Sequence, residues 1–186
     1  MRAALISMTG QPSGALAGKT LARRQLDFAL AAGCESVIAL GDGASAQAIA
    51  LRHATEAAGA RFQAIRDSHG VLGVVRAADE LLALAPGLLP EAGGALAALD
   101  KGAALLVLPA GPGVAAGFER IDLERAWAGA VVVSGAQVER LSALPADSAP
   151  ASALMRIALQ ARVAAGLLPF GTRMVAVEEA DRKSVV

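Results

Sequence analysis

The feature that most limits the fold of this chain is its alternation of short apolar runs with amphipathic, Ala-rich segments. Arg2–Met8 is a short apolar run that predicts a buried strand, and Thr9–Gly14 predicts a polar loop after it. Thr20–Ala32 then has helical spacing, with Gly33 where a C-cap is expected. Ser36–Leu40 follows as a second strand. Strand, helix and strand in this order are typical of a parallel βαβ unit.

The rest of the chain keeps this rhythm. We predict a single α/β domain over residues 1–186, with three layers and a mostly parallel sheet covered by helices on both faces. Its further helices are Ala44–Ala58 (with Ile49, Ala50 and Ala57 facing inward), Ala95–Asp100, Gly135–Leu141 and Ala149–Ala164. Its further strands are Arg61–Ile65, Leu81–Leu84, Ala103–Leu108 (buried and parallel), Phe118–Leu123 (an edge strand), Trp127–Val133 and Thr172–Val177, with Ala110–Gly117 as a loop.

Composition and charge exclude several classes of protein. The 17 basic and 17 acidic residues balance, and no basic stripe indicates a nucleic-acid partner. The single Cys rules out an internal disulfide framework and fits a reducing compartment. No apolar run reaches the roughly 18 residues of a membrane span, and no signal peptide is recognisable. We therefore expect a cytoplasmic protein without a membrane segment, and the sequence leaves room for a homo-oligomer.

Five segments, in the right order, resemble the sugar nucleotidyltransferases, a family with a Rossmann-related, GT-A-like fold. They are the strand and Gly loop Leu5–Gly10, the helix start Leu16–Leu21, the helix, turn and strand Leu26–Ile38, the segment His69–Ala78, and the later stretch Phe118–Val133. The ending Met174–Asp181 is similar to the closing strand of the family. In that family the backbone corresponding to His69–Ala78 approaches the nucleotide base. The resemblance implies a nucleotide or sugar-nucleotide ligand, and Mg²⁺ as cofactor if the protein is active.

Two elements of the family's mechanism have no counterpart at their expected positions. Relatives place a metal-binding Asp after the central strand, where this chain has Leu81–Gly87 without an acidic residue. They also carry an Arg and a Lys in the phosphate loop, and no basic residue stands between Gly10 and Ala17. Nucleotidyl transfer needs the charge of the phosphates to be neutralised. We therefore expect weak or lost transfer.

The candidate ligand-binding residues are small or polar and fall in two segments. In the first segment, the backbone N–H groups of Gly10, Ser13 and Gly14 could bind a phosphate, or the loop could be an ordinary turn. Lys19 could reach an anion, or it could be a solvated surface lysine. In the second, a histidine could contact a ligand and two glycines could allow close approach; the alternatives are structural. The candidates are Gly10, Ser13, Gly14, Lys19, His69, Gly70 and Gly73.

We expect the carboxyl edge of the sheet to gather Gly10, Ser13, Lys19, Asp42 and His69. Asp42 itself is better explained as a turn residue. Other residues are assigned no site role: Glu119, Asp122 and Glu124 are expected to be exposed, Trp127 to lie in the core or a pocket wall, and Cys34 to be a buried thiol. The two His residues and the Cys have no metal-ligand spacing, so no metal site is predicted from them.

Three hypotheses for function remain. The first is a divergent nucleotidyltransferase-like protein that binds a nucleotide or sugar nucleotide, with weak or lost transfer between an NTP and a sugar phosphate. The second is an active nucleotidyltransferase for a small phosphorylated acceptor. The third, a dinucleotide-binding Rossmann domain, is disfavoured because no G-x-G-x-x-G follows the first strand.

Overall fold

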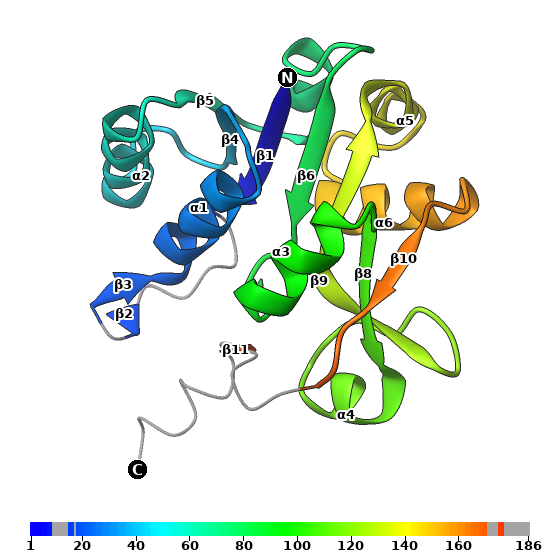
Figure 1. The fold of residues 1–186 in the computed structure, drawn as a ribbon. Coiled ribbons are helices and arrows are strands. Elements are labelled where there is room, and N and C mark those ends of the chain that lie inside the picture. Colours follow the sequence, from blue (N-terminus) through cyan, green and yellow to red (C-terminus); the bar gives the residue numbers. More distant parts are fainter. Residues whose placement is uncertain (9–14, 17, 171–174, 177–186) are drawn as a thin grey trace.

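A seven-stranded sheet forms the centre of the molecule (Figure 1). The computed structural model describes residues 1–8, 15–16, 18–170 and 175–176. The strands of the sheet are β1 (Arg2–Ser7), β4 (Ser36–Leu40), β5 (Arg61–Ile65), β6 (Glu80–Leu84), β8 (Leu105–Pro109), β9 (Arg125–Ser134) and β10 (Ala165–Leu167). Two short strand pairs lie outside it: β2 (Ala15–Leu16) with β3 (Lys19–Thr20), and β7 (Leu88–Leu89) with β11 (Val175–Ala176).

The strand order is β10-β8-β9-β6-β1-β4-β5. β1 pairs in parallel with β4 on one side and β6 on the other, and β4 pairs in parallel with β5. β9 runs antiparallel to both of its neighbours, β6 and β8, while β10 is parallel to β8. The predicted mostly parallel α/β sheet is thus confirmed. The strand predicted over Ala103–Leu108 is β8, and it is parallel to only one of its two neighbours.

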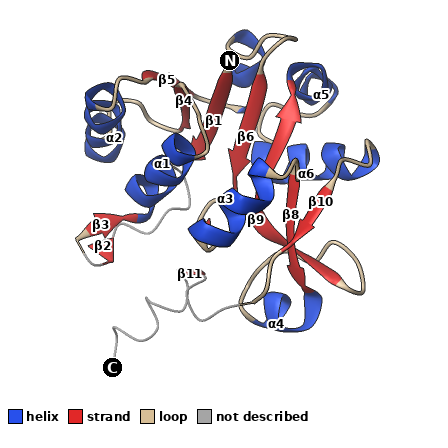
Figure 2. Ribbon diagram, in the orientation of Figure 1, coloured by secondary structure: helices blue, strands red, loops and turns tan. Residues whose placement is uncertain are grey.

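Helices cover both faces of the sheet (Figure 2). On one face lie α1 (Leu21–Ala31), α2 (Ala46–Ala57), α3 (Ala92–Asp100) and α4 (Ala110–Ala115), and on the other lie α5 (Gly135–Val138), α6 (Pro150–Gln160) and the 3₁₀ helices η1 (Ser68–Gly73) and η2 (Glu139–Ala143). Within the described residues, no helix is long and apolar enough to span a membrane.

β1 shows why the sheet needs cover on both sides. Successive side chains of a strand point to opposite faces. Ala3 and Leu5 accordingly pack in the apolar cluster under α5 and α6, while Ala4 and Ile6 pack in the cluster under α1. All four are at most 1% exposed. An uninterrupted apolar run is therefore what a central parallel strand requires.

Local signals set the ends of the first helices. The Thr20 side chain accepts a hydrogen bond from the Arg23 backbone N–H (3.2 Å) and caps α1. Ser45 caps α2 in the same way through Ala48 (3.1 Å). After α1 the chain turns at Gly33, whose φ of +84° is the left-handed conformation expected of a glycine that ends a helix.

Two predictions between β8 and β9 are wrong. Ala110–Gly117 was expected to be a loop because of its Gly and Pro content, but most of it forms α4, where Gly113 lets the helix pack closely on β9. Phe118–Leu123 was expected to be an edge strand, but it makes only an isolated bridge, Arg120 with Ala126. The Asp122 carboxylate accepts the backbone N–H groups of Glu124 and Arg125, which turns the chain before a ladder can form.

The inward face predicted for α2 is also wrong. Ala48, Leu51 and Thr55 are the buried residues, whereas Ile49 is 41% exposed. α2 covers the edge of the sheet, so only a narrow stripe of the helix is buried. Because apolar residues occur all around this Ala-rich helix, the sequence does not show which stripe faces the sheet. The structure also adds β10, which the sequence did not predict. Of the last predicted strand, Val175–Ala176 is β11; Thr172–Met174 and Val177 lie outside the described residues.

Gly135 lies where two backbone segments meet. It begins α5, and its N–H donates to the Asp79 carbonyl at 2.9 Å. A Cβ atom at this position would lie 1.9 Å from the Arg76 carbonyl oxygen. No side chain can be accommodated there unless one of the two backbone segments moves.

We therefore expect Gly135→Ala to lower the free energy of unfolding by about 1–3 kcal/mol, as overpacking does in well-packed interiors. Urea denaturation followed by circular dichroism measures the change. Gly111→Ala in α4 is the matched control, because a Cβ there meets nothing within 4 Å. Equal midpoints for the two variants would show that the Gly135 contact is not close.

Candidate functional site

A cavity of about 710 Å³ opens at the carboxyl ends of the parallel strands. Ser7 at the end of β1, Leu40 at the end of β4, Arg66 just after β5 and Leu84 at the end of β6 all line it. The chain leaves β1 for β4 and β5 on one side and later returns to β6 on the other. The cavity thus lies at the point where strand order switches, the usual place for ligands in open α/β sheets.

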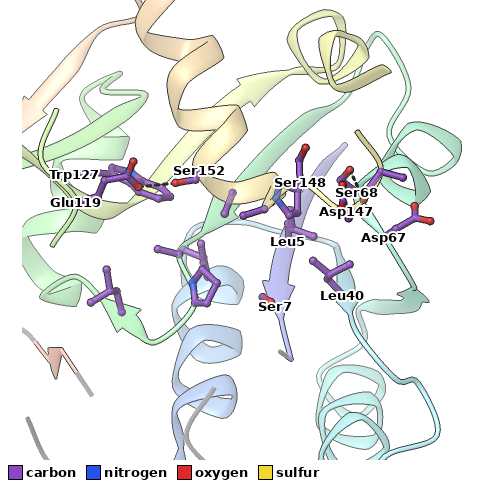
Figure 3. A pocket seen from close by; sticks show the side chains of 18 of the residues that line it. Leu5, Ser7, Leu40, Asp67, Ser68, Glu119, Trp127, Asp147, Ser148 and Ser152 are labelled. Atoms are coloured by element: carbon purple, nitrogen blue, oxygen red, sulfur yellow. Dashed lines mark hydrogen bonds between the residues drawn. The ribbon is translucent and has the colours of Figure 1, made fainter. Parts of the chain in front are cut away.

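One end of the cavity is built around Glu119 (Figure 3). Its carboxylate accepts a hydrogen bond from the Ser152 hydroxyl at 2.5 Å and another from the Arg156 guanidinium at 2.7 Å. Both donors belong to α6. Trp127 of β9 lies beside it, with its backbone N–H bonded to the Glu119 carbonyl (2.7 Å) and its indole N–H bonded to the Ala130 carbonyl (3.1 Å). The carboxylate is therefore fixed in position at the cavity wall.

The other end is formed by η1 and the loop that leads into α6. Asp67, Ser68, Asp147 and Ser148 gather there (Figure 3). Ser68 is 1% exposed, and both its hydroxyl (2.9 Å) and its backbone N–H (3.0 Å) donate to the Ala146 carbonyl. These bonds tie two segments, far apart in the sequence, into one wall.

A turn after β6 forms the middle of the wall. Gln25 of α1 is fully buried, and its side-chain amide donates to the carbonyls of Ala85 (2.9 Å) and Leu88 (2.8 Å). Pro86 and Gly87 lie between those two carbonyls. This is the place where the resemblance expects a metal-binding Asp, and an uncharged amide holds the turn instead.

Among the described residues, the cavity does not contain a ready-made cluster of protein ligands for Mg²⁺. Its lining has the carboxylates of Asp67, Glu119 and Asp147 and the guanidinium of Arg66. Within the described ranges, no group of three or more His, Cys, Asp or Glu side chains is arranged to hold a metal ion. Glu119 is already bonded to Ser152 and Arg156.

The candidates from the first loop contribute little that can be placed. Gly10, Ser13 and Gly14 lie outside the described residues. Lys19 forms an ion pair with Asp27 (2.8 Å) and does not line the cavity. Partial burial raises the pKa of Asp27, but hydrogen bonds from Lys19 and Arg23 outweigh it and hold that pKa below its usual value. Asp42 accepts the Ala44 N–H (2.9 Å), as a turn residue does.

The candidates from the second segment, His69, Gly70 and Gly73, lie on η1, and none of them lines the cavity. The His69 ring forms a hydrogen bond through Nε2 with the Leu144 carbonyl at 2.7 Å. Gly70 packs on Ile65, where a Cβ would approach to 2.7 Å. Gly73 is exposed and lines a different cavity, at the amino ends of β4 and β5. His69, Gly70 and Gly73 are therefore not part of the wall of the cavity at the carboxyl edge.

The sequence did not indicate Glu119, Ser152 or Arg66 as site residues. Glu119 was expected to be exposed, yet it is half-buried at the cavity, and its partners lie 33 and 37 positions further along the chain. No local pattern encodes such a pairing. Cys34 is buried, and burial raises the pKa of its thiol to about 12, which is unsuited to a nucleophile.

Comparison with known proteins identifies the fold. No protein-family model matches the chain, and no curated protein matches its sequence. Solved structures do match. UDP-glucose pyrophosphorylase from Acinetobacter baumannii aligns with a TM-score of 0.64 and 13% identity over 100% of this chain and 92% of its own. A UTP-bound form of that enzyme aligns at 0.60 and 13%, over 93% and 87%.

The 4-diphosphocytidyl-2C-methyl-D-erythritol synthase from Anaerococcus prevotii aligns with a TM-score of 0.56 and 12% identity, over 96% of this chain and 93% of its own. The similarity therefore extends over almost the whole of each protein at an identity that shows fold and not activity. The chain has the α/β fold of the sugar nucleotidyltransferases.

Proposed function

We propose that this protein binds a nucleotide or a sugar nucleotide in the cavity at the carboxyl edge of the sheet, and that its capacity for nucleotidyl transfer is weak or lost. The observation that carries the proposal is the turn after β6. This turn lines a cavity of ligand size at the point where strand order switches. The turn itself has no carboxylate, and the uncharged Gln25 side chain holds it in place.

The binding part of the proposal is supported by position and by shape. A cavity of about 710 Å³ has the volume of small-molecule sites, which are mostly apolar with a few fixed polar groups. Leu5, Leu40 and Leu84 form its apolar wall, and Glu119 is a polar group fixed by two hydrogen bonds. One solved structure with this fold is bound to UTP.

The loss of transfer is supported by charge. The wall has three carboxylates and one guanidinium among the described residues, which is unfavourable for the developing charge of a phosphoryl group. The loop Thr9–Gly14 contains no basic residue. Of the described residues that line the cavity, Arg66 alone could offer a cation to a nucleotide phosphate.

We expect UTP to bind, and Arg66→Gln to weaken its binding about tenfold, the effect of losing one charge-assisted hydrogen bond. Isothermal titration calorimetry, with and without Mg²⁺, measures the affinity. Arg61→Gln is the matched control, since Arg61 is the first residue of β5, at the end of the strand opposite to Arg66. If UTP and UDP-glucose both fail to bind, the binding proposal fails. Equal losses in the two variants would place the nucleotide elsewhere.

We expect pyrophosphate release to stay below about 1 s⁻¹, the lower end of ordinary turnover. The reason is that losing even one preorganised electrostatic contact costs roughly 10²–10³ in rate. A coupled pyrophosphate assay over the common NTPs and sugar phosphates, with Mg²⁺, measures this. Turnover at ordinary rates would support the second hypothesis, an active nucleotidyltransferase for a small phosphorylated acceptor.

Gly73→Val tests whether η1 cradles the base, as the resemblance implies. A Cβ at Gly73 meets nothing within 4 Å, and Gly73 lines the cavity at the amino edge. We therefore expect the variant to keep both its melting temperature and its affinity for UTP. A folded variant that no longer binds UTP would show that the base does lie against this backbone.

A further inference from the structure

A second cavity lies between η2 and α6. Its volume is about 510 Å³, and its charged lining is opposite in sign to that of the first. Arg140 and Arg156 contribute two guanidiniums, and no carboxylate belongs to the lining within the described part of the chain. Leu144 and Ile157 are the large apolar residues in its wall.

The periodicity of α6 explains how this wall forms. Ser152, Arg156 and Gln160 follow one another at intervals of four residues, so they form one row along the helix. Arg140 of η2 faces that row and donates to the Gln160 side-chain oxygen at 2.6 Å. Ile157, one position after Arg156, is 6% exposed and packs inward. The polar side chains of this row therefore lie next to the apolar part of the wall, which Leu144 and Ile157 form.

We propose that this cavity is a binding site for a small amphiphilic anion, a phosphate or carboxylate group on a short apolar body. Arg140 is bonded to the uncharged Gln160 side chain and Arg156 is paired with Glu119, so an anion in this cavity would be attracted by two guanidiniums of which Glu119 neutralises one. Arg presents several N–H donors in a planar fork, which suits the oxygen atoms of either group. The apolar part of the ligand would pack against Leu144 and Ile157. This proposal does not rest on nucleotide binding in the first cavity.

Arg156 connects the new site to Glu119. Its guanidinium lines the second cavity, and its Nη2 donates to the Glu119 carboxylate, which lines the first. The side chain of Arg156 is 67% exposed, so part of its guanidinium is accessible to a ligand. Glu119 competes with the anion for Arg156. Removing the Glu119 charge should strengthen anion binding.

The test uses n-hexyl phosphate as probe, with inorganic phosphate and 1-hexanol as its separate halves and hexanoate as the carboxylate counterpart. Calorimetry gives affinities, and methyl NMR shifts of Leu144 and Ile157 locate the probe. We expect n-hexyl phosphate or hexanoate to bind more tightly than either half. Arg140→Gln and Arg156→Gln should each weaken binding about tenfold, as expected for one charge-assisted hydrogen bond. Glu119→Gln should strengthen it.

Arg52→Gln is the control, because Arg52 of α2 lies over Phe62 on another surface and its loss changes the net charge equally. The proposal is overturned if Arg52→Gln weakens binding as much as the two test variants, if inorganic phosphate binds as tightly as n-hexyl phosphate and hexanoate, or if the methyl groups of Leu144 and Ile157 do not shift. Should Arg156→Gln fail to fold, Arg140→Gln decides alone, because Arg140 has no bond to Glu119.

Discussion

The burial of β1 on both faces is the constraint on which the rest of the structure depends. Ala3 to Ile6 are almost fully buried, and their alternation sends side chains into both apolar clusters. With parallel partners on both sides, β1 also fixes the position of the strand-order switch. Its carboxyl end at Ser7 therefore opens into the cavity. The packing that stabilises the sheet thus also determines where the candidate ligand cavity lies.

The turn after β6 lacks the Asp that the family resemblance leads one to expect there. Gln25 reaches it from α1 and satisfies two of its carbonyls. A buried amide that makes two hydrogen bonds stabilises a turn without adding charge. The cavity therefore keeps its shape while its floor remains apolar at Ala85 and Pro86. A cavity of ligand size beside a turn without a carboxylate is the physical basis of our proposal that ligand binding is kept and transfer is weak or lost.

α6 organises the polar parts of both cavities. Ser152 and Arg156 fix Glu119 in the first, and Arg156 with Gln160 lines the second. Because Arg156 lines the second cavity and is bonded to Glu119 of the first, the proposed anion site would be coupled to the first cavity through this ion pair. Such coupling is reciprocal. If an anion binds more weakly when the Arg156–Glu119 ion pair is stronger, then the bound anion weakens that ion pair by the same free energy.

The sequence by itself determined the elements with strong local signals. β1, β4 and β5, the end of α1 at Gly33, and the alternation that predicts an α/β sheet were all readable, because a buried strand must be apolar and a helix often ends at a glycine. The direction of β9 and the existence of β10 depend on partners distant in sequence. The same holds for Glu119, which meets Ser152 and Arg156 only after the helix packs. Tertiary structure alone decided the site, because its contacts join segments that no local pattern connects.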